Sequence, residues 1–217
     1  MSDRELTLAK IRQEKLIAIV RGMKLSVMEE LAAALLAGGI SLIEVTFAQN
    51  QPDTWPDTAE AIRRLNEGFG GKILAGAGTV LTERQMHMAY DAGARYIITP
   101  NTNPEIISGT RKLELVSLPG AMTPTEIEAA WEAGADMVKV FPAGNLGPGY
   151  FKAVRAPLSH IPMLAVGGVD EKNIPDFLAA GACGFGVGGN LVNRGWIAEG
   201  AFDRITELAA KYVAAVR

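Results

Sequence analysis

A chain of 217 residues with 48% hydrophobic residues, 21% charged residues and 24 glycines has the length and composition of one globular α/β domain. Its net charge of -3, with acidic and basic residues interspersed, offers no basic stripe for nucleic acid, and no stretch approaches the ~20 apolar residues of a membrane-spanning helix. The N-terminal segment is charged and has no apolar leader core, so we expect a cytoplasmic protein with no nucleic-acid or membrane partner.

Disulfide and metal chemistry have little support in the sequence. Cys183 is the only cysteine, so no disulfide can form within the chain, and its small neighbours are typical of packing before a strand. The two histidines, His87 and His160, lie far apart in the sequence and suggest no zinc-type cluster. We therefore expect neither a metal nor another cofactor.

Eight short apolar or β-branched runs alternate with longer segments of helical period, which is the pattern of repeated βαβ units in a parallel sheet. Most runs are apolar on both faces, as barrel strands are. No linker or low-complexity segment divides the chain. The sequence therefore predicts a single-domain (β/α)8 barrel, or TIM barrel, over residues 1–217. Its expected strands are 16–21, 42–46, 73–77, 96–99, 114–118, 137–141, 163–166 and 184–187.

Helix signals flank these strands. The residues Ser26 to Glu29 and Thr123 to Glu126 both fit a capping box, which predicts a helix start at each. An extra helix is expected over 3–13, ahead of the first strand, and a last helix over 201–216. The longest irregular stretch, 47–56, follows the second strand and is expected on the carboxyl face of the barrel, where active sites are built. Glycines predict helix ends in Ala-Gly-Gly at 37–39 and in Ala-Gly-Ala at 92–94, 133–135 and 180–182.

A lysine stands at the centre of the sixth predicted strand. Lysine is almost never fully buried unless it is paired or functional. The alternation of a strand places Met137, Lys139 and Phe141 on one face. If that face is the barrel interior, the ammonium group lies at the opening of the barrel, partly shielded from water. Desolvation lowers the pKa of an amine and frees its lone pair to attack a carbonyl. The alternative is that Lys139 points outward, with its stem packed between two helices.

An acid lies within the apolar second strand. Alternation places Glu44 on the same face as Thr46, which is a candidate substrate-binding residue. Schiff-base chemistry would explain the acid, because carbinolamine formation, dehydration and the enamine step each need a proton moved by a group with a raised pKa. The alternative is a structural ion pair between Lys139 and Glu44 that fills the barrel centre.

The ends of other predicted strands supply groups that could bind an anion. Arg21 ends the first strand and could hold a carboxylate or phosphate, and Thr79 follows the third strand and could donate its hydroxyl to the carboxylate of a keto acid. Either residue could instead be a cap or a surface residue. Glycine pairs after the last two strands let backbone N–H groups approach a phosphate, at Gly167-Gly168 and Gly188-Gly189.

Together these motifs resemble the 2-keto-3-deoxy-6-phosphogluconate (KDPG) and 4-hydroxy-2-oxoglutarate (KHG) aldolase family, class I aldolases with relatives that act on the 6-phosphogalactonate epimer. The resemblance covers nearly the whole chain, and the order of the motifs makes it specific. Besides the two glycine loops, the motifs are Ile-Val-Arg-Gly at 19–22, Ile-Glu-Val-Thr at 43–46, Gly-Ala-Gly-Thr-Val-Leu at 76–81, Thr-Pro-Asn at 99–101 and Lys-Val-Phe-Pro-Ala at 139–143.

The resemblance implies that Lys139 forms the Schiff base and that Glu44 is the proton shuttle. It implies a pyruvate pocket shaped by Thr79 and the Pro100 turn, with Phe141 packed beside it. It also implies a phosphorylated substrate that is cleaved to pyruvate and glyceraldehyde 3-phosphate, and a homotrimeric assembly. The expected phosphate cradle consists of Gly167, Gly168, Gly188 and Gly189.

Two departures from the family pattern leave alternatives open. Many members carry a carboxylate-binding arginine where this chain has Ala48, so Arg21 is the substitute that we expect, as in galactonate-type relatives. Asn190 stands where a serine often contacts phosphate, and its amide can still donate a hydrogen bond. These departures favour, as an alternative, a 4-hydroxy-2-oxoglutarate aldolase that gives pyruvate and glyoxylate. Two further alternatives do not depend on them: a non-catalytic sugar-phosphate-binding barrel, in which Lys139 and Glu44 neutralise each other, and a phosphosugar isomerase or epimerase on the same fold. The C4 stereochemistry of the substrate stays open.

Overall fold

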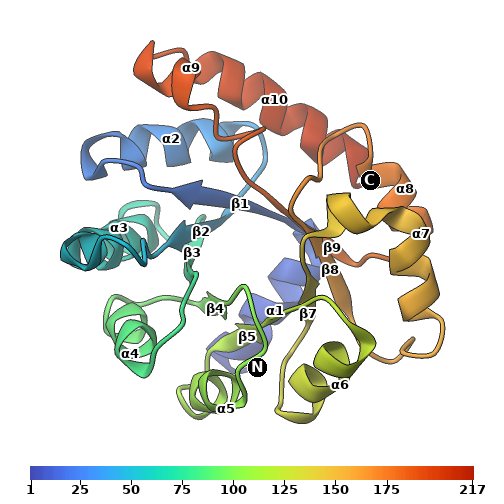
Figure 1. Ribbon diagram of the computed structural model, residues 1–217. Helices are drawn as coiled ribbons and strands as arrows, with labels where there is room; N and C mark the ends of the chain where they lie inside the picture. The colour runs from blue at the N-terminus through green and yellow to red at the C-terminus, as the bar shows by residue number, and fades with distance from the viewer.

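The computed structural model describes residues 1–217 as an α/β barrel, in which an inner ring of parallel strands is surrounded by helices (Figure 1). Every hydrogen-bonded pair of strands is parallel, and the strand order is β5-β4-β3-β2-β1-β9-β8-β7-β6. The strands are β1 Leu16–Arg21, β2 Leu42–Thr46, β3 Leu74–Gly78, β4 Tyr96–Ile98, β5 Val116–Leu118, β6 Gly120–Ala121, β7 Val138–Val140, β8 Met163–Val166 and β9 Gly184–Val187.

The helices pack on the outside of this ring, apart from α1, which lies across one end of it (Figure 1). None of them combines the length and the apolar character needed to span a bilayer. The helices are α1 Asp3–Glu14, α2 Leu25–Ala37, the short 3₁₀ helix η1 Pro52–Thr54, α3 Trp55–Gly68, α4 Glu83–Asp91, α5 Pro104–Lys112, α6 Pro124–Glu132, α7 Ala143–Arg155, α8 Ile174–Ala179, α9 Arg194–Ala198 and α10 Phe202–Ala215.

The fifth predicted strand differs most from the structure. Glu114 has a φ of 57° and ends the turn after α5, so the strand begins at Val116 instead. Pro119 has no N–H group and separates β5 from β6. The segment that includes β7 nevertheless hydrogen-bonds to both sides of the break. The Asp136 N–H donates to the Ser117 carbonyl at 2.9 Å, and the Lys139 N–H donates to the Pro119 carbonyl at 2.8 Å.

The predicted helix boundaries are partly correct. The capping box of α6 is present, with the Glu126 N–H donating to the Thr123 hydroxyl at 3.3 Å. The one predicted at Ser26 is wrong, because α2 already begins at Leu25 and its N-cap, Lys24, makes no side-chain cap. The glycines expected to end helices do adopt the left-handed backbone that an L side chain disfavours, at Gly39, Gly93, Gly134 and Gly181.

Two apolar cores hold the fold together. A large outer cluster lies between the strands and the surrounding helices, and a smaller inner cluster fills the barrel. The inner cluster follows strand alternation, for example with Ile17 and Ile19 on β1. Ile11 and Leu8 of α1 pack against the same inner cluster. Helix α1 therefore closes the floor of the barrel, at the amino ends of the strands.

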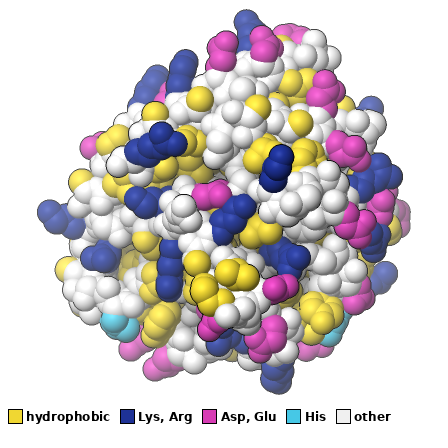
Figure 2. Space-filling model, turned by 180° about the vertical axis from the view of Figure 1, so that it is seen from behind, with side chains coloured by type: hydrophobic (Ala, Val, Ile, Leu, Met, Phe, Trp, Pro, Cys, Tyr) yellow, Lys and Arg dark blue, Asp and Glu magenta, His cyan; other side chains and the backbone are white.

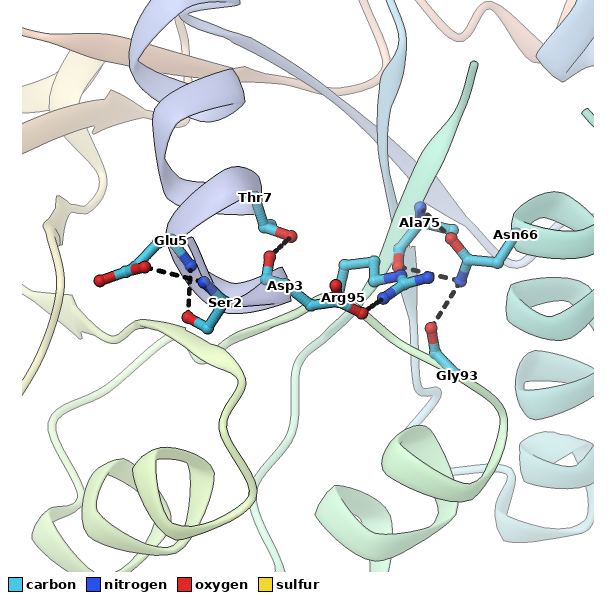
Figure 3. Close-up of polar contacts among 8 residues, drawn as sticks. All are labelled: Ser2, Asp3, Glu5, Thr7, Asn66, Ala75, Gly93 and Arg95. Atoms are coloured by element: carbon cyan, nitrogen blue, oxygen red, sulfur yellow. Dashed lines mark hydrogen bonds and ion pairs between the residues drawn. The ribbon is translucent and has the colours of Figure 1, made fainter. Parts of the chain in front are cut away.

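Polar contacts attach α1 to this floor (Figure 3). Ser2 and Glu5 form a capping box at its start, and Asp3 accepts a hydrogen bond from Arg95, just before β4, at 2.9 Å. Nearby, the Asn66 side chain bridges α3 to the barrel, because it accepts from the Ala75 N–H and donates to the Gly93 carbonyl. Across the face seen in Figure 2, acidic and basic side chains are interspersed, with no stripe of one sign.

Asp136 is the main ionic link between α1 and the barrel, and its loss is expected to destabilise the protein. Its carboxylate, 4% exposed, accepts from Arg4 of α1, from Arg111 at 2.9 Å and from the buried Ser117 N–H at 2.9 Å. Asp136→Ala leaves all three donors without this acceptor, so we expect the free energy of unfolding to fall by about 3 kcal/mol. Thermal unfolding should show a melting temperature about 6–12 °C lower.

The exposed Asp91 at the end of α4 is the matched control, because it forms no ion pair. Asp91→Ala should leave the melting temperature unchanged. An Asp136→Ala protein that melts with the wild type would contradict the proposed role of this ionic link.

Candidate active site

A cavity of about 650 Å³ opens at the carboxyl ends of the strands, opposite the floor closed by α1. Most of the residues predicted for the site come together there, from six different strands and the loops that follow them. Glu44 and Thr46 do not line the cavity, because both are buried in the barrel interior with 2% and 4% of their surface exposed. The predicted residues that line it are Arg21, Thr79, Pro100, Lys139, Phe141, Gly167, Gly168, Gly188, Gly189 and Asn190.

Lys139 projects into the barrel interior from the centre of β7, rather than outward between helices. It is 7% exposed and lines the cavity, and its Nζ lies 5.0 Å from the centre of the Phe141 ring. Burial lowers the pKa of Lys139 below its ordinary value, against the opposing effect of Glu44, and the positive charge of Arg21 lowers the pKa further. The lowered pKa increases the fraction of neutral amine, which is the nucleophilic form.

Glu44 supplies an acid in the same interior. Burial raises the pKa of Glu44, and the positive charges of Lys139 and Arg21 oppose that rise. Lys139 and Glu44 interact electrostatically, and no hydrogen bond or salt bridge joins them directly. An acid with a raised pKa beside an amine with a lowered pKa is a pair suited to proton transfer near neutral pH.

The neighbouring strand leaves room for the Glu44 side chain only because it carries glycine. In the register of the sheet, Thr46 of β2 pairs with Gly78 of β3. A Cβ atom on Gly78 would overlap the carboxylate of Glu44, and a Cβ on Gly76 would overlap the ring of Tyr96. The glycines of β3 therefore determine where the carboxylate lies and allow Tyr96 to fill the space in the inner core.

Two threonines have unusual environments at this end of the barrel. The hydroxyl of Thr46 is buried and has no hydrogen-bond partner, which is costly for a polar group. Thr79, directly after β3, has a φ of 55°, in the left-handed region that a β-branched residue rarely adopts. Such local strain is often found at functional sites.

The glycine loops after β8 and β9 also line the cavity. Gly167 has a φ of 86°, and a Cβ atom there would lie 3.0 Å from the Phe141 ring. Gly168 packs against the backbone of Gly144, whose N–H donates to the Gly167 carbonyl at 2.7 Å. The loops thus present backbone rather than side chains to the cavity, which suits the close approach of an anion.

Sequence reasoning missed several cavity residues, of which Arg194 is the most informative. Its Nη2 donates to the Arg21 carbonyl at 2.9 Å, and it approaches closely because Gly22 has no side chain to block it. Arg194 begins the short helix α9, which was not predicted, and its N-cap Asn193 was the available signal. The other unpredicted lining residues are Ile19, Met23, Val166, Val169, Gly186, Val192, Asn193 and Gly195.

Comparison with known proteins agrees with this geometry. The family model described as KDPG and KHG aldolase matches residues 8–208. A probable 2-dehydro-3-deoxy-6-phosphogalactonate aldolase from Rhizobium meliloti (strain 1021) is 38% identical over 201 residues, which make up 92% of this chain and 92% of that protein.

Solved structures share the architecture. One described as native KDPGal is 34% identical, with a TM-score of 0.83 over 92% of this chain and 93% of the other. A KDPG aldolase from Legionella pneumophila, with pyruvate captured at low pH as a covalent carbinolamine intermediate, is 28% identical, with a TM-score of 0.83 over 97% of each chain.

Proposed function

Because the chain belongs to the KDPG and KHG aldolase family, we propose that it cleaves a 2-keto-3-deoxy-6-phospho sugar acid through a Schiff base on Lys139. The protein is a class I aldolase, a lyase that releases pyruvate and an aldehyde. The proposed aldehyde is glyceraldehyde 3-phosphate. The observation that carries the proposal is the buried Lys139 amine with a lowered pKa, facing an open cavity beside the buried acid Glu44.

In the proposed mechanism, the neutral amine of Lys139 attacks the C2 carbonyl, and loss of water from the carbinolamine gives an iminium ion. The C4 hydroxyl then gives up its proton, the C3–C4 bond breaks, and its electron pair moves through C2 to the nitrogen. The aldehyde leaves, and protonation of the enamine at C3 followed by hydrolysis releases pyruvate and the free lysine. Glu44 carries the protons in these steps, as its raised pKa suits.

The two charged ends of the substrate are proposed to bind to different groups of the cavity wall. Arg21 binds the carboxylate, because position 48 carries alanine instead of the arginine found in many members of the family. The Thr79 hydroxyl donates a hydrogen bond to the keto-acid end. Pro100 and Phe141 shape the pocket around this end, and the proposed contribution of Thr46 is indirect, from its buried position on β2. The proposed phosphate-binding groups are the backbone of Gly167, Gly168, Gly188 and Gly189, the amide of Asn190 and the guanidinium of Arg194, all of which line the cavity.

We favour the 6-phosphogalactonate epimer as substrate. Relatives named for that epimer are 38% and 35% identical over 92% and 93% of this chain, and a relative from Treponema pallidum named for the gluconate epimer is 35% identical over 82% of it. A coupled assay of pyruvate release compares the galactonate-type and gluconate-type substrates with unphosphorylated 4-hydroxy-2-oxoglutarate. The highest kcat/KM is expected with the galactonate-type substrate. A preference for the unphosphorylated acid would instead indicate a 4-hydroxy-2-oxoglutarate aldolase, which the departures at Ala48 and Asn190 support.

Borohydride trapping tests the Schiff base directly. Incubation with pyruvate and borohydride should add the mass of one reduced pyruvate to the protein, and peptide mapping should locate it on Lys139. The reduction makes the carbon–nitrogen bond permanent, so the adduct reports the intermediate itself. Borohydride without pyruvate is the blank, and a protein that gains no mass in the presence of pyruvate would contradict the proposal.

Finer points of architecture and assembly belong to the same proposal. We count β5 and β6 as one strand broken at Pro119, which makes the fold a (β/α)8 barrel with α1 as an extra N-terminal helix. The homotrimer and the cytoplasmic location stay predictions, and analytical ultracentrifugation would measure the first.

A further inference from the structure

Thr79 is held in a backbone conformation that it would not adopt unaided. Its φ of 55° is in the left-handed region, where the branched Cβ of threonine crowds the backbone. The other non-glycine residues with positive φ are Lys15 and Glu114, and neither lines the cavity. Thr79 therefore combines strain with a place on the cavity wall, and strain of this kind persists only when the surroundings hold it.

A chain of two side-chain amides leads to the Thr79 carbonyl from helix α4. Gln49, in the loop after β2, donates its Nε2 to the Thr79 carbonyl at 2.6 Å. Gln85 of α4, fully buried, donates its Nε2 to the Gln49 Oε1 at 3.0 Å. The Oε1 of Gln85 in turn accepts from the backbone N–H groups of Leu81, at 2.8 Å, and Thr82, at 3.2 Å. These acceptor contacts fix the amide of Gln85 so that its NH2 group faces Gln49.

The other end of the relay is anchored as well. The Trp55 Nε1 donates to the Ala48 carbonyl at 2.8 Å, which holds the backbone next to Gln49. The Trp55 ring packs against Phe47 and lies under the guanidinium of Arg84, 5.7 Å from the ring centre. The loop after β2 is thus attached to the first turn of α4, and the Gln49 side chain extends from a supported backbone.

Helix capping alone does not explain the glutamine at position 85. Three helices of the chain have capping boxes, and the other two use glutamate at the corresponding position, Glu5 in α1 and Glu126 in α6. Capping needs only an acceptor oxygen, which glutamate provides. The NH2 group that distinguishes Gln85 from them is the group that donates to Gln49.

We propose that Gln49 and Gln85 are positioning residues that hold Thr79 in place for binding the keto-acid end of the substrate. The proposal rests on the aldolase function proposed above. By fixing the Thr79 carbonyl, the relay fixes the peptide after it and thereby the direction of the threonine hydroxyl. Both glutamines act through Thr79 and make no contact with the reacting atoms.

The test uses Gln85→Glu, which keeps the capping oxygen and removes the donor, and Gln49→Ala, which removes the middle of the relay. We expect each variant to raise the pyruvate concentration for half-maximal borohydride trapping on Lys139 roughly tenfold. The KM for the cleaved substrate should rise by a similar factor, with kcat changed less than about twofold. The control is Glu126→Gln, the reverse exchange in the capping box of α6, which should leave both quantities unchanged.

A Thr79→Gly background separates positioning from general loosening. Glycine accepts the left-handed backbone without strain and has no hydroxyl to position. If the relay acts through Thr79, adding Gln85→Glu to Thr79→Gly should not raise the half-saturating pyruvate concentration further. If the two residues act independently, the two increases would multiply. The proposal would be overturned if Gln85→Glu and Gln49→Ala left the half-saturating pyruvate concentration unchanged. It would also be overturned if Gln85→Glu raised that concentration by the same factor in the Thr79→Gly background as in the wild type.

A crystal structure of Gln85→Glu tests the relay without any activity measurement. We expect the Thr79 carbonyl to lose its contact with Gln49 and the peptide after Thr79 to rotate, and an unchanged orientation of that peptide would overturn the proposal. A wild-type protein that gives no pyruvate adduct at all would instead refute the Schiff-base function, and the backbone of Thr79 in the variant would still decide on the relay.

Discussion

Replacing Lys139 by alanine is expected to abolish pyruvate release, with kcat lower by a factor on the order of 10⁴ or more. Without the amine no carbinolamine can form. Folding should be preserved, because Glu44 can take up a proton when its positive neighbour is lost, and so avoids a buried charge. The coupled pyruvate-release assay and a thermal unfolding curve measure the two effects.

Two variants serve as controls for Lys139→Ala. Lys139→Arg keeps a positive charge but offers no amine for a Schiff base, so it should be as inactive as the alanine variant. Lys152→Ala removes an exposed lysine of the neighbouring helix α7 and should retain full activity. A kcat for Lys139→Ala on the order of 10⁻² of the wild-type value would mean that another residue forms the Schiff base.

Glu44→Gln is expected to lower kcat by about 10²- to 10⁴-fold while leaving the protein at least as stable. Glutamine keeps the shape of the side chain but cannot move a proton. At neutral pH the buried carboxylate costs stability, because burial raises the pKa of Glu44 and the folded state favours the protonated form. The variant removes this cost, so its melting temperature at neutral pH should equal or exceed that of the wild type.

The pH dependence of stability checks the sign of this effect. A carboxyl whose pKa is raised on folding contributes stability below the ordinary value of 4.5, and the contribution is lost as the pH rises through the raised pKa. As the pH rises from 4.5 through the raised pKa, the free energy of unfolding of Glu44→Gln should therefore increase relative to that of the wild type. A variant that melts well below the wild type throughout would contradict a raised pKa for Glu44.

Strand alternation predicts much of the site, because a barrel strand has only an inner and an outer face. The apolar flanks of Lys139 and Glu44 marked both residues as unusual, but the pattern alone left open whether Lys139 points into the barrel or outward between helices. The break at Pro119 was also open to prediction, since proline cannot donate to a strand ladder. The expected eight runs nevertheless contained no separate β6, because two residues give too little pattern to recognise.

Other features depend on contacts that no local pattern describes. The start of α2 at Leu25 follows from the extended backbone of Lys24, and the Ser26 motif fits a capping box without forming one. Gln49 and Gln85 are 36 residues apart and meet only when the loop after β2 lies against α4. Arg194 reaches the Arg21 carbonyl across 173 residues of sequence. Such partners are set by tertiary packing, which the sequence pattern alone does not contain.

The plug that α1 forms in the barrel floor has a kinetic consequence. Ile11 and Leu8 fill the end of the barrel that lies opposite the cavity, so substrate and both products share one entrance. In the proposed mechanism Lys139 holds pyruvate covalently after the C3–C4 bond has broken, so the aldehyde leaves through that entrance first and pyruvate leaves last. Pyruvate should then inhibit competitively against the substrate, and the aldehyde should show mixed inhibition.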